Sequence, residues 1–408
     1  MMEAKATPGR DASEKHLYMQ TNEVRNAIAH YRRDADGTIE LIERVETGGA
    51  GSGVFKPVSG QESAPNAFEG ASSVILAERE TLLFTTNGGD NSVTSFSVAP
   101  NGGLTVVDRQ STGEPVTGRS GTAKSLAYSP ECRTLFVLHA FGPNHLRSYT
   151  VADDGKLTLR PEQHTVNTAT KTDRVSTQVV LSPDGKFLLV DILFDARPAL
   201  NPDGSAKLIV ANAPDPDGLV VFPVRENGTL GDASFVDAGG AGPFYIGFLN
   251  GSNDVFLNGV AVGDGVVVSR IDREGRVTNG PLVAIDTSPG KPSELCWLQV
   301  TSDNSVVLAT NFGYGTVSTY QLEEGRLSIL KDPANIEIPG DGTFRAVNGL
   351  VSSGPSDSWL APDDRYFYQI FANASVLVSY HLDKRTGKLT EVGRSLIPYN
   401  SPQGVAGF

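Results

Sequence analysis

The sequence predicts an all-β protein, a seven-bladed β-propeller with four antiparallel strands in each blade. The first observation behind this prediction is a turn signature that occurs seven times. It consists of a polar residue, a glycine, any residue and an apolar residue, with glycines at positions 37, 102, 155, 228, 275, 325 and 387. These glycines are 47 to 73 residues apart and span the chain. Such a repeat is typical of a radial array of similar units.

The second observation is a short strand before each of these turns. It ends in an aromatic residue in six repeats and in arginine in one, at Tyr31, Phe96, Tyr149, Phe222, Arg270, Tyr320 and Tyr380. After the turn another segment alternates apolar and polar residues, as in LTVV at 104–107. Alternation with a period of two predicts half-buried strands on both sides of the turn.

The third observation is a pair of strands earlier in each repeat. It is clearest in STQVVLSPDGKFLLV at 176–190, where Ser-Pro-Asp-Gly forms a tight turn. Degenerate forms of this turn occur at 129–132 and 361–364. We name the four strands A to D, from the innermost to the outermost. Closure of seven such units into a ring leaves few exposed sheet edges.

The two ends of the chain predict how the ring closes. Residues from about 16 to 47 supply only the last strands of blade 1, and residues 401–408 resemble an A strand with nothing after it. We therefore expect the C-terminal strand to pair with the N-terminal strand in blade 1. The predicted organisation is a flexible segment over residues 1–15 and a single propeller domain over 16–408.

Composition narrows the classes of partner. The net charge is −13 with six histidines taken as neutral, which disfavours nucleic acids and anionic membranes as partners. No run reaches the length of about 18 apolar residues that a membrane span needs. The polar start of the sequence predicts no signal peptide, so we expect a cytoplasmic protein, although a trimmed leader would give the same sequence. Cys132 and Cys296 are predicted to be free thiols. The oligomeric state stays open.

Loop lengths predict which face carries the function. The three longest insertions, at 48–70, 192–218 and 339–357, all fall in D–A or B–C connections, which lie on one face of a propeller. Loops that lengthen on one face favour a binding site there. Tolerated surface insertion is the alternative.

A second periodic position lies at the end of strand B. It holds Asn22, Asn87, His139, Asp191, Asn258, Asn311 and, in blade 7, Phe371 or nearby Gln369. Asparagine here can cap backbone N–H groups, which is a purely structural role. His139 and Asp191 place titratable groups where the repeat needs only an amide. A histidine is suited to act as a base near neutral pH.

Residues at the starts of the A strands share this face. Glu294 could serve as acid or base, or could pair with Lys291. Arg174 and Arg197 could hold an anionic group, or could pair with Asp173 or Asp195. An apolar wall for a ring-shaped ligand, or simple packing between blades, is the expectation for Trp297, Tyr314, Phe141 and Phe371.

These positions form the predicted site. The candidate catalytic residues are His139, Glu294, Asp191 and Arg174. The candidate substrate-binding residues are Asn87, Arg197, Tyr245, Asn258, Trp297, Asn311, Tyr314 and Phe371. The sequence has no GxSxG, HExxH, Walker or CxxC motif, so no cofactor is predicted. A channel Ca²⁺ site built from ring asparagines with Asp191 or Glu294 is a further possibility.

With its repeats aligned, the chain resembles the lactonase-like seven-bladed propellers, which include a 6-phosphogluconolactonase and a carboxy-muconate cyclase. The resemblance is carried by the repeated strand and glycine turn, LSPDGKFLLV at 181–190, VETGGAG at 45–51 and ELCWLQVTSDNSVVLATNFGYGTVSTY at 294–320. It departs where phosphogluconolactonase-like members have histidines: this chain has DRVSTQ at 173–178 and NFGY at 311–314. The glutamate and aspartate of that pattern correspond to Glu294 and Asp191.

The resemblance implies a lactonase-like enzyme that acts on a small cyclic substrate. The loss of basic residues argues against a sugar phosphate and favours a less polar molecule. His139 or Glu294 would move the proton, and Arg174, Arg197, Asn87 and Asn311 would stabilise an oxyanion. Two alternatives stay open. One is a cyclase that positions a reactive aromatic or polyketide-like substrate, and the other is a non-catalytic propeller that binds a small molecule or a protein.

Overall fold

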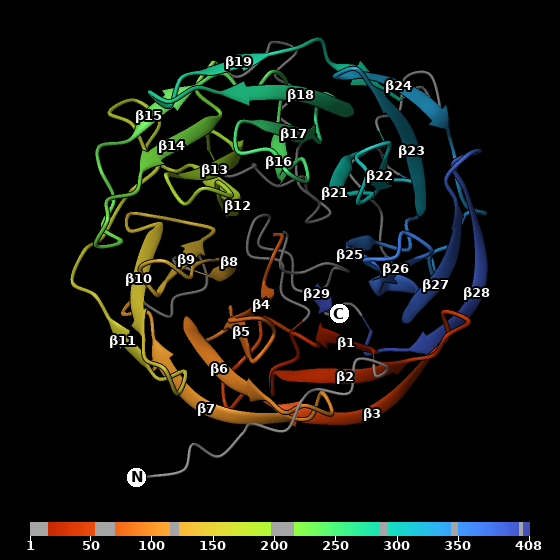
Figure 1. Ribbon diagram of the computed structural model, residues 1–408, viewed down its shortest axis with the longest axis horizontal. Coiled ribbons are helices and arrows are strands. Elements are labelled where there is room, and N and C mark those ends of the chain that lie inside the picture. Colours follow the sequence, from red (N-terminus) through yellow and green to blue (C-terminus); the bar gives the residue numbers. More distant parts are fainter. Residues whose placement is uncertain are drawn as a thin grey trace, which may run out of the picture.

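The computed structural model describes residues 15–53, 70–114, 122–196, 216–285, 293–343, 350–399 and 403–408. They form a closed ring of seven antiparallel sheets around a central channel (Figure 1), so the predicted seven-bladed propeller is confirmed. Each blade has the path A to D from the channel outward, and blade 5 has one additional short strand. The N-terminal segment that we expect to be flexible lies outside the described residues, except for Lys15.

Blade 1 closes the ring as the sequence predicts. Its strands, from the channel outward, are β29 (Gln403–Gly407), β1 (Lys15–Gln20), β2 (Ala27–Arg33) and β3 (Ile39–Glu46). β29 pairs antiparallel with β1 in the register Met19 to Val405. The backbones of His16 and Phe408 add two hydrogen bonds of 3.0 and 3.1 Å. The two ends of the chain are therefore held in one sheet.

The next three blades follow in chain order, each from strand A to strand D. Blade 2 contains β4 (Val74–Ala77), β5 (Leu82–Asn87), β6 (Ser92–Val98) and β7 (Leu104–Ser111). Blade 3 contains β8 (Ala123–Ser129), β9 (Thr134–His139), β10 (Leu146–Val151) and β11 (Leu157–Leu159). Blade 4 contains β12 (Val175–Leu181), β13 (Phe187–Phe194), β14 (Leu219–Pro223) and β15 (Ser234–Val236).

The last three blades complete the circle. Blade 5 contains β16 (Pro243–Phe248), β17 (Val255–Val260), β18 (Gly265–Ile271) and β19 (Val277–Asn279), with β20 (Val283–Ala284) also paired to β18. Blade 6 contains β21 (Leu295–Val300), β22 (Val306–Asn311), β23 (Thr316–Glu323) and β24 (Arg326–Lys331). Blade 7 contains β25 (Pro355–Leu360), β26 (Tyr366–Phe371), the 3₁₀ turn η1 (Ala372–Ala374), β27 (Val376–Asp383) and β28 (Lys388–Leu396).

The repeated glycine turns connect strands C and D, and in six of the seven a Cβ on the glycine would contact the preceding blade. Gly37 has φ +86°, and a Cβ there would lie 2.1 Å from the Tyr366 ring of blade 7. Gly387 has φ +69°, and a Cβ there would lie 2.2 Å from the Thr319 hydroxyl of blade 6. A side chain would therefore be strained and would also clash. Glycine is therefore required at these positions both by the turn conformation and by the close packing between blades.

The three long connections leave the ring where the sequence places them. Residues 48–70 lie between strand D of blade 1 and strand A of blade 2, 195–218 lie in a B–C connection, and 339–354 precede strand A of blade 7. The predicted insertions therefore extend too far at 192–194, which belong to β13, and at 355–357, which belong to β25. Residues 54–69, 197–215 and 344–349 within them lie outside the described part of the chain. The prediction of a site on the long-loop face therefore stays a prediction.

Candidate active site in the central channel

A bulge occurs at the same level in six of the seven innermost strands. The pairing register between strands A and B shifts in β29, β8, β12, β16, β21 and β25. The residues at these shifts are Gly404, Lys124, Thr177, Phe244, Cys296 with Trp297, and Ser356 with Asp357. A bulge leaves residues out of the ladder and redirects their side chains. Here the bulges place residues that differ in type from blade to blade in one layer around the channel.

The segment Gly70–Ser73, which leads into β4, crosses the channel at this layer. The backbone N–H of Ala71 donates to Thr177 of blade 4 at 3.2 Å. The indole Nε1 of Trp297 in blade 6 donates to the Gly70 carbonyl at 3.2 Å. The Ser73 hydroxyl donates to Gln20 of blade 1 at 2.7 Å. One short segment therefore contacts blades on several sides and fills the channel at this level.

The predicted aromatic wall takes part in this filling. Trp297 is fully buried and meets Phe244 edge to face, with ring centroids 4.6 Å apart. It shares a core cluster with Ala71, Leu193, Ala261, Cys296 and Phe312. Phe141, in the connection after β9, and Phe371, at the end of β26, are fully buried, and Tyr314 is half-buried in the turn after β22. These contacts favour the packing role that we kept as the alternative for these residues.

His139 ends strand β9 and is fully buried. Its Nδ1 donates to the His145 carbonyl at 3.1 Å, and its Nε2 accepts from the Thr112 hydroxyl at 2.8 Å. Burial lowers the pKa of His139 to about 3, so the ring is neutral at pH 7. Both ring nitrogens are engaged with the protein. The geometry favours a structural cap that bridges blades 2 and 3 over the predicted role as a base.

Asp191 and Asn258 form a buried pair between blades 4 and 5. The Asn258 amide donates to Asp191 at 3.2 Å, and both side chains are fully buried. Burial raises the pKa of Asp191 well above its ordinary value. Within the described part of the chain, Asp191 Oδ2 and Asn258 Oδ1 have no hydrogen-bond partner. The catalytic role of Asp191 and the substrate-binding role of Asn258 stay predictions, and the burial of both residues favours a structural role between the blades.

Asn87 and Asn311 occupy matching places in blades 2 and 6. The Asn87 amide donates to Ser92 and Thr94 at 3.0 Å, while its oxygen accepts from Asn26 and Thr47. The Asn311 amide donates to two hydroxyls of the next strand, Thr316 and Ser318. Both asparagines thus tie the end of strand B to strand C. These contacts favour a structural role, although they are made to side chains and not to the backbone N–H groups that the sequence analysis expects.

Arg174 is a buried cation inside an ion-pair network. Its Nη2 lies 3.0 Å from Asp195 and 2.8 Å from Asp217, and the side chain is fully buried. Lys171 pairs with the same two carboxylates. Pairing with Asp195 is the alternative that the sequence offered for Arg174. Its predicted companion Arg197 lies outside the described residues, as does Lys291 near Glu294.

Glu294 introduces strand β21 with a left-handed backbone. Its φ is +54°, and only 8% of the residue is exposed. Its carbonyl accepts from the Phe312 backbone at 3.2 Å and from the Cys296 thiol at 3.1 Å. These contacts fix the entry of the A strand in blade 6. Glu294 does not line either of the two cavities described next.

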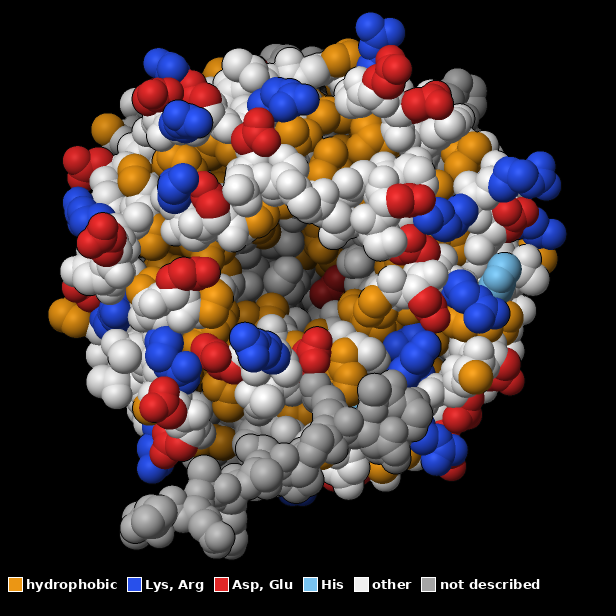
Figure 2. All heavy atoms as spheres, viewed as in Figure 1, with side chains coloured by type: hydrophobic (Ala, Val, Ile, Leu, Met, Phe, Trp, Pro, Cys, Tyr) orange, Lys and Arg blue, Asp and Glu red, His pale blue; other side chains and the backbone are white. Residues whose placement is uncertain are grey.

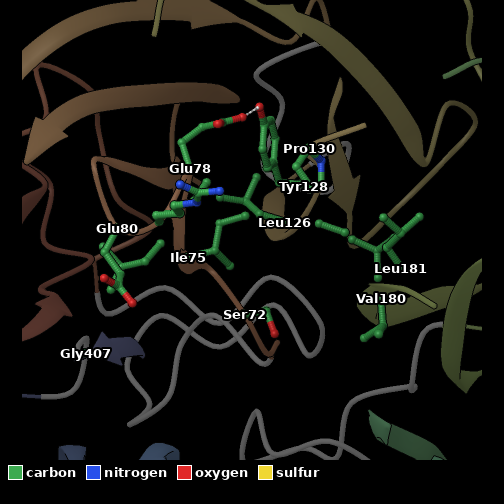
Figure 3. Close-up of a pocket in the computed structure, with 15 residues that line it drawn as sticks. Ser72, Ile75, Glu78, Glu80, Leu126, Tyr128, Pro130, Val180, Leu181 and Gly407 are labelled. Atoms are coloured by element: carbon green, nitrogen blue, oxygen red, sulfur yellow. Dashed lines mark hydrogen bonds between the residues drawn. The ribbon is translucent and has the colours of Figure 1, made fainter. Parts of the chain in front are cut away.

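Below the filled layer the channel is open, and Figure 2 shows a hollow at the centre of the ring. An inner cavity of about 350 Å³ is lined by residues that include Tyr245, Gln299, Asp357 and Trp359. An outer cavity of about 820 Å³ reaches the A–B turns at residues 78–80 and 130 (Figure 3). The two cavities share Ser72, Ile75, Leu76 and Gly407, so they adjoin along β4. They lie toward the face opposite the long loops.

Asp357 is the ionisable group that distinguishes the inner cavity. It lies in the bulge of β25, is 4% exposed, and accepts backbone hydrogen bonds from Ser358 at 2.9 Å and from Ser72 and Val405. Desolvation outweighs these bonds and raises the pKa of Asp357 to about 7. A carboxyl that titrates near neutral pH on a cavity wall can accept and return a proton.

Tyr245 and Gln299 complete this group. Burial and the nearby Asp357 charge raise the pKa of Tyr245, so its phenol stays protonated at neutral pH. The Gln299 amide interacts with the Tyr245 oxygen and donates to the Ser358 carbonyl at 2.8 Å. Tyr245 is the one predicted site residue that lines this cavity. A protonated phenol beside a half-ionised carboxyl can donate to an oxygen that gains negative charge.

The sequence analysis missed Asp357 because it assigned residues 339–357 to a long insertion, whereas strand A of blade 7 already begins at Pro355. Asp357 lies in the bulge of strand A, a position at which the residue type differs between blades. Alignment of the A strands on Trp297 would have shown an acid in blade 7 where other blades have Lys124, Thr177 or Phe244. Its environment, however, depends on Ser72 and Val405, which are distant in the sequence.

No family model and no curated protein sequence matches the chain. Among solved structures, it is similar to a periplasmic gluconolactonase of Pseudomonas aeruginosa at 17% identity and a TM-score of 0.67, covering 97% of this chain and 99% of that one. A putative 6-phosphogluconolactonase of Bacteroides fragilis has 16% identity and a TM-score of 0.64, with 98% and 99% covered. That of Bacteroides uniformis has 14% and 0.65, with 97% and 99% covered. The lactonase-like propeller fold is thus shown.

Two further properties concern possible partners. Among the described residues, no helix has the length and apolar character that crossing a membrane requires. The same part of the chain contains no group of three or more His, Cys, Asp or Glu side chains that could hold a metal ion. The small-molecule partner and the cytoplasmic location remain expectations from the sequence.

Proposed function

We propose that this protein hydrolyses a small, non-phosphorylated lactone in the central cavity, with Asp357 as the general base. The observation that carries the proposal is the position of Asp357, a carboxyl with a pKa of about 7 on the wall of a 350 Å³ cavity. Cavities of this size suit small ligands. The likeness to a gluconolactonase supports the reaction class through fold alone.

The residues at hand suffice for the reaction. Ionised Asp357 takes a proton from water as the water oxygen attacks the lactone carbonyl. The Tyr245 hydroxyl donates a hydrogen bond to the oxyanion that forms. When the ring C–O bond breaks, the proton on Asp357 passes to the departing alkoxide. The product is a hydroxy acid, and Asp357 returns to its ionised state.

The charge of the inner cavity supports a substrate without phosphate. The residues that line it, all within the described part of the chain, include Asp357 and no lysine or arginine. A phosphate group there would be desolvated without a cation to pair with. This agrees with the loss of basic residues seen in the sequence.

The test is hydrolysis of a panel of lactones by the wild-type protein and by Asp357→Asn. We expect the wild-type kcat/KM to rise with pH with an apparent pKa near 7. Removal of a general base should lower the rate about 10²- to 10⁴-fold. Asp191→Asn is the matched control, because it changes another buried aspartate with a raised pKa that lines neither of these two cavities.

A second variant distinguishes the loss of a catalytic group from misfolding. Asp357 accepts three backbone N–H groups, so Asp357→Asn could weaken the fold. Tyr245→Phe keeps the ring and removes only the proposed oxyanion donor, so it should lower kcat about tenfold or more with little change in melting temperature. Full turnover in both variants, or equal losses in Asp191→Asn, would show that the reaction takes place elsewhere.

A further inference from the structure

The outer cavity has a different chemical character from the inner one. Its wall is formed mainly by Ile75, Leu76, Leu126, Val179, Val180 and Leu181, and Figure 3 shows several of these side chains around the opening. Ile75, Leu76, Val180 and Leu181 are only partly buried, although they belong to the innermost strands of their blades. Apolar side chains that face an open cavity next to polar groups are typical of a ligand site.

The mouth of this cavity is charged and firmly held. Glu78, Arg79 and Glu80 form the A–B turn of blade 2, and all three have left-handed φ angles between +49° and +61°. The Tyr128 hydroxyl donates to Glu78, as Figure 3 shows, and Arg133 lies 3.1 Å from the same carboxylate. A left-handed run of this kind costs free energy, so the surrounding contacts must hold the turn in place.

The charge at the mouth bears on what could pass through it. Two carboxylates and one guanidinium line the opening at residues 78–80. Arg133 pairs with Glu78, so these carboxylates and the two guanidinium groups of Arg79 and Arg133 balance one another in charge. A neutral apolar group would pass the rim and could bury its surface against Val180 and Leu181.

We propose that the substrate is a lactone with a neutral apolar substituent, with its ring in the inner cavity beside Asp357 and its substituent in the outer cavity. The proposal rests on the proposed function and specifies its substrate class. The shared residues Ser72, Ile75, Leu76 and Gly407 connect the polar site to the apolar one. A ligand that fills both cavities must therefore be amphiphilic.

The test uses γ-butyrolactone and its alkyl homologues from ethyl to hexyl. In the wild-type protein, each added methylene should raise kcat/KM about fourfold until the cavity is filled, the factor that corresponds to about 0.8 kcal/mol per buried methylene. Calorimetric binding of the same series to Asp357→Asn should show the same trend without turnover. A flat series in both measurements would overturn the proposal.

A matched pair of variants locates the apolar subsite. Val180→Thr exchanges a methyl for a hydroxyl in the outer cavity and should reduce the preference for the hexyl over the ethyl lactone by several-fold. Val106→Thr makes the same change on β7, where Val106 is 42% exposed and far from the channel wall, and should keep the preference. An equal preference in both variants would place the alkyl chain elsewhere.

The outcomes separate this proposal from the proposed function. Hydrolysis of all homologues at one rate would leave Asp357 as the base and exclude the apolar subsite. Binding that tightens with chain length, together with no hydrolysis of any homologue by the wild type, would keep the apolar subsite and exclude lactonase activity.

Discussion

Two levels of the same channel differ in what occupies them. At the level of the bulges, Gly70, Ala71 and the buried Trp297 occupy the channel, and Ser72 and Asp357 form the edge of this layer toward the inner cavity. Below this level, the same inner strands surround cavities of about 350 and 820 Å³. Both levels are built from equivalent strands of a repeated blade. The difference therefore arises from individual residues and from one connecting segment, and the fold itself does not specify it.

Buried aspartates illustrate what this difference means for function. Asp191 is sealed between blades 4 and 5 with Asn258, whereas Asp357 lies on the wall of the inner cavity. Burial raises the pKa of both. A perturbed pKa therefore identifies a candidate only when a substrate can reach the group.

The largest effect is expected from a change that affects both levels at once. Deletion of residues 402–408 removes β29, whose Gly404 lies against Ser73 at the filled level and whose Val405 bonds Asp357 at the open level. The ring would lose the strand that pairs with β1. We expect no cooperative thermal transition. A melting temperature equal to that of the full chain would show that the ring closes without this strand.

The two tryptophans compare the levels directly. Trp297→Ala at the filled level should lower the free energy of unfolding by about 3–5 kcal/mol, because it leaves a large void. Trp359→Ala at the open level should cost less, since Trp359 is partly exposed to the cavity and stacks beneath Arg33 at 4.6 Å. Urea denaturation measures both. Equal losses would mean that the two levels are equally packed.

The next largest effect concerns the pH dependence of stability, which should differ between the wild type and Asp357→Asn. The unfolded chain releases this proton near its ordinary pKa of 3.8, whereas the native state keeps it up to about 7. Between these values the native state binds more protons, so the free energy of unfolding falls as pH rises. The loss could reach about 2–4 kcal/mol. We expect the difference between wild type and Asp357→Asn to change between pH 4 and 7 and to be constant from pH 8 upward.

The sequence could predict whatever the repeat imposes on every blade. The turn glycines and the alternation of apolar residues predicted the blade number and the strand order, which the seven sheets confirm. The two ends of the chain predicted the ring closure, which the pairing of β29 with β1 confirms. Asn87 and Asn311 occupy matching places, as the alignment has them, but their amides bond side-chain hydroxyl groups and do not accept the backbone N–H groups that the capping role predicts.

The site could not be predicted in the same way, because it depends on contacts between distant segments. Asp357 owes its environment to Ser72 and Val405, and the filled level depends on a segment that leaves the repeat just before β4. Deviation from the repeat drew attention to His139. In the structure, His139 is larger than asparagine but has a similar structural role, because its ring nitrogens bond the His145 carbonyl and the Thr112 hydroxyl.

His139→Asn is the change with the smallest expected effect, and it tests whether a break in the pattern implies chemistry. Asparagine occupies the matching place in blades 2 and 6, as Asn87 and Asn311, but it would not fill the space between Thr112 and the His145 carbonyl. We expect a loss of about 1–3 kcal/mol in stability at pH 7 and unchanged turnover for each folded molecule.

The stability of His139→Asn below pH 6.5 provides a second measurement. Burial lowers the pKa of His139 from 6.5 to about 3, so below pH 6.5 the unfolded chain binds a proton that the native state refuses. Wild-type stability should therefore fall as pH drops from 6.5 toward 3, and His139→Asn should fall less steeply. His145, with a pKa lowered to about 4, keeps part of the dependence in both proteins. A hundredfold loss of turnover at unchanged stability would instead make His139 the base and move the reaction to the long-loop face.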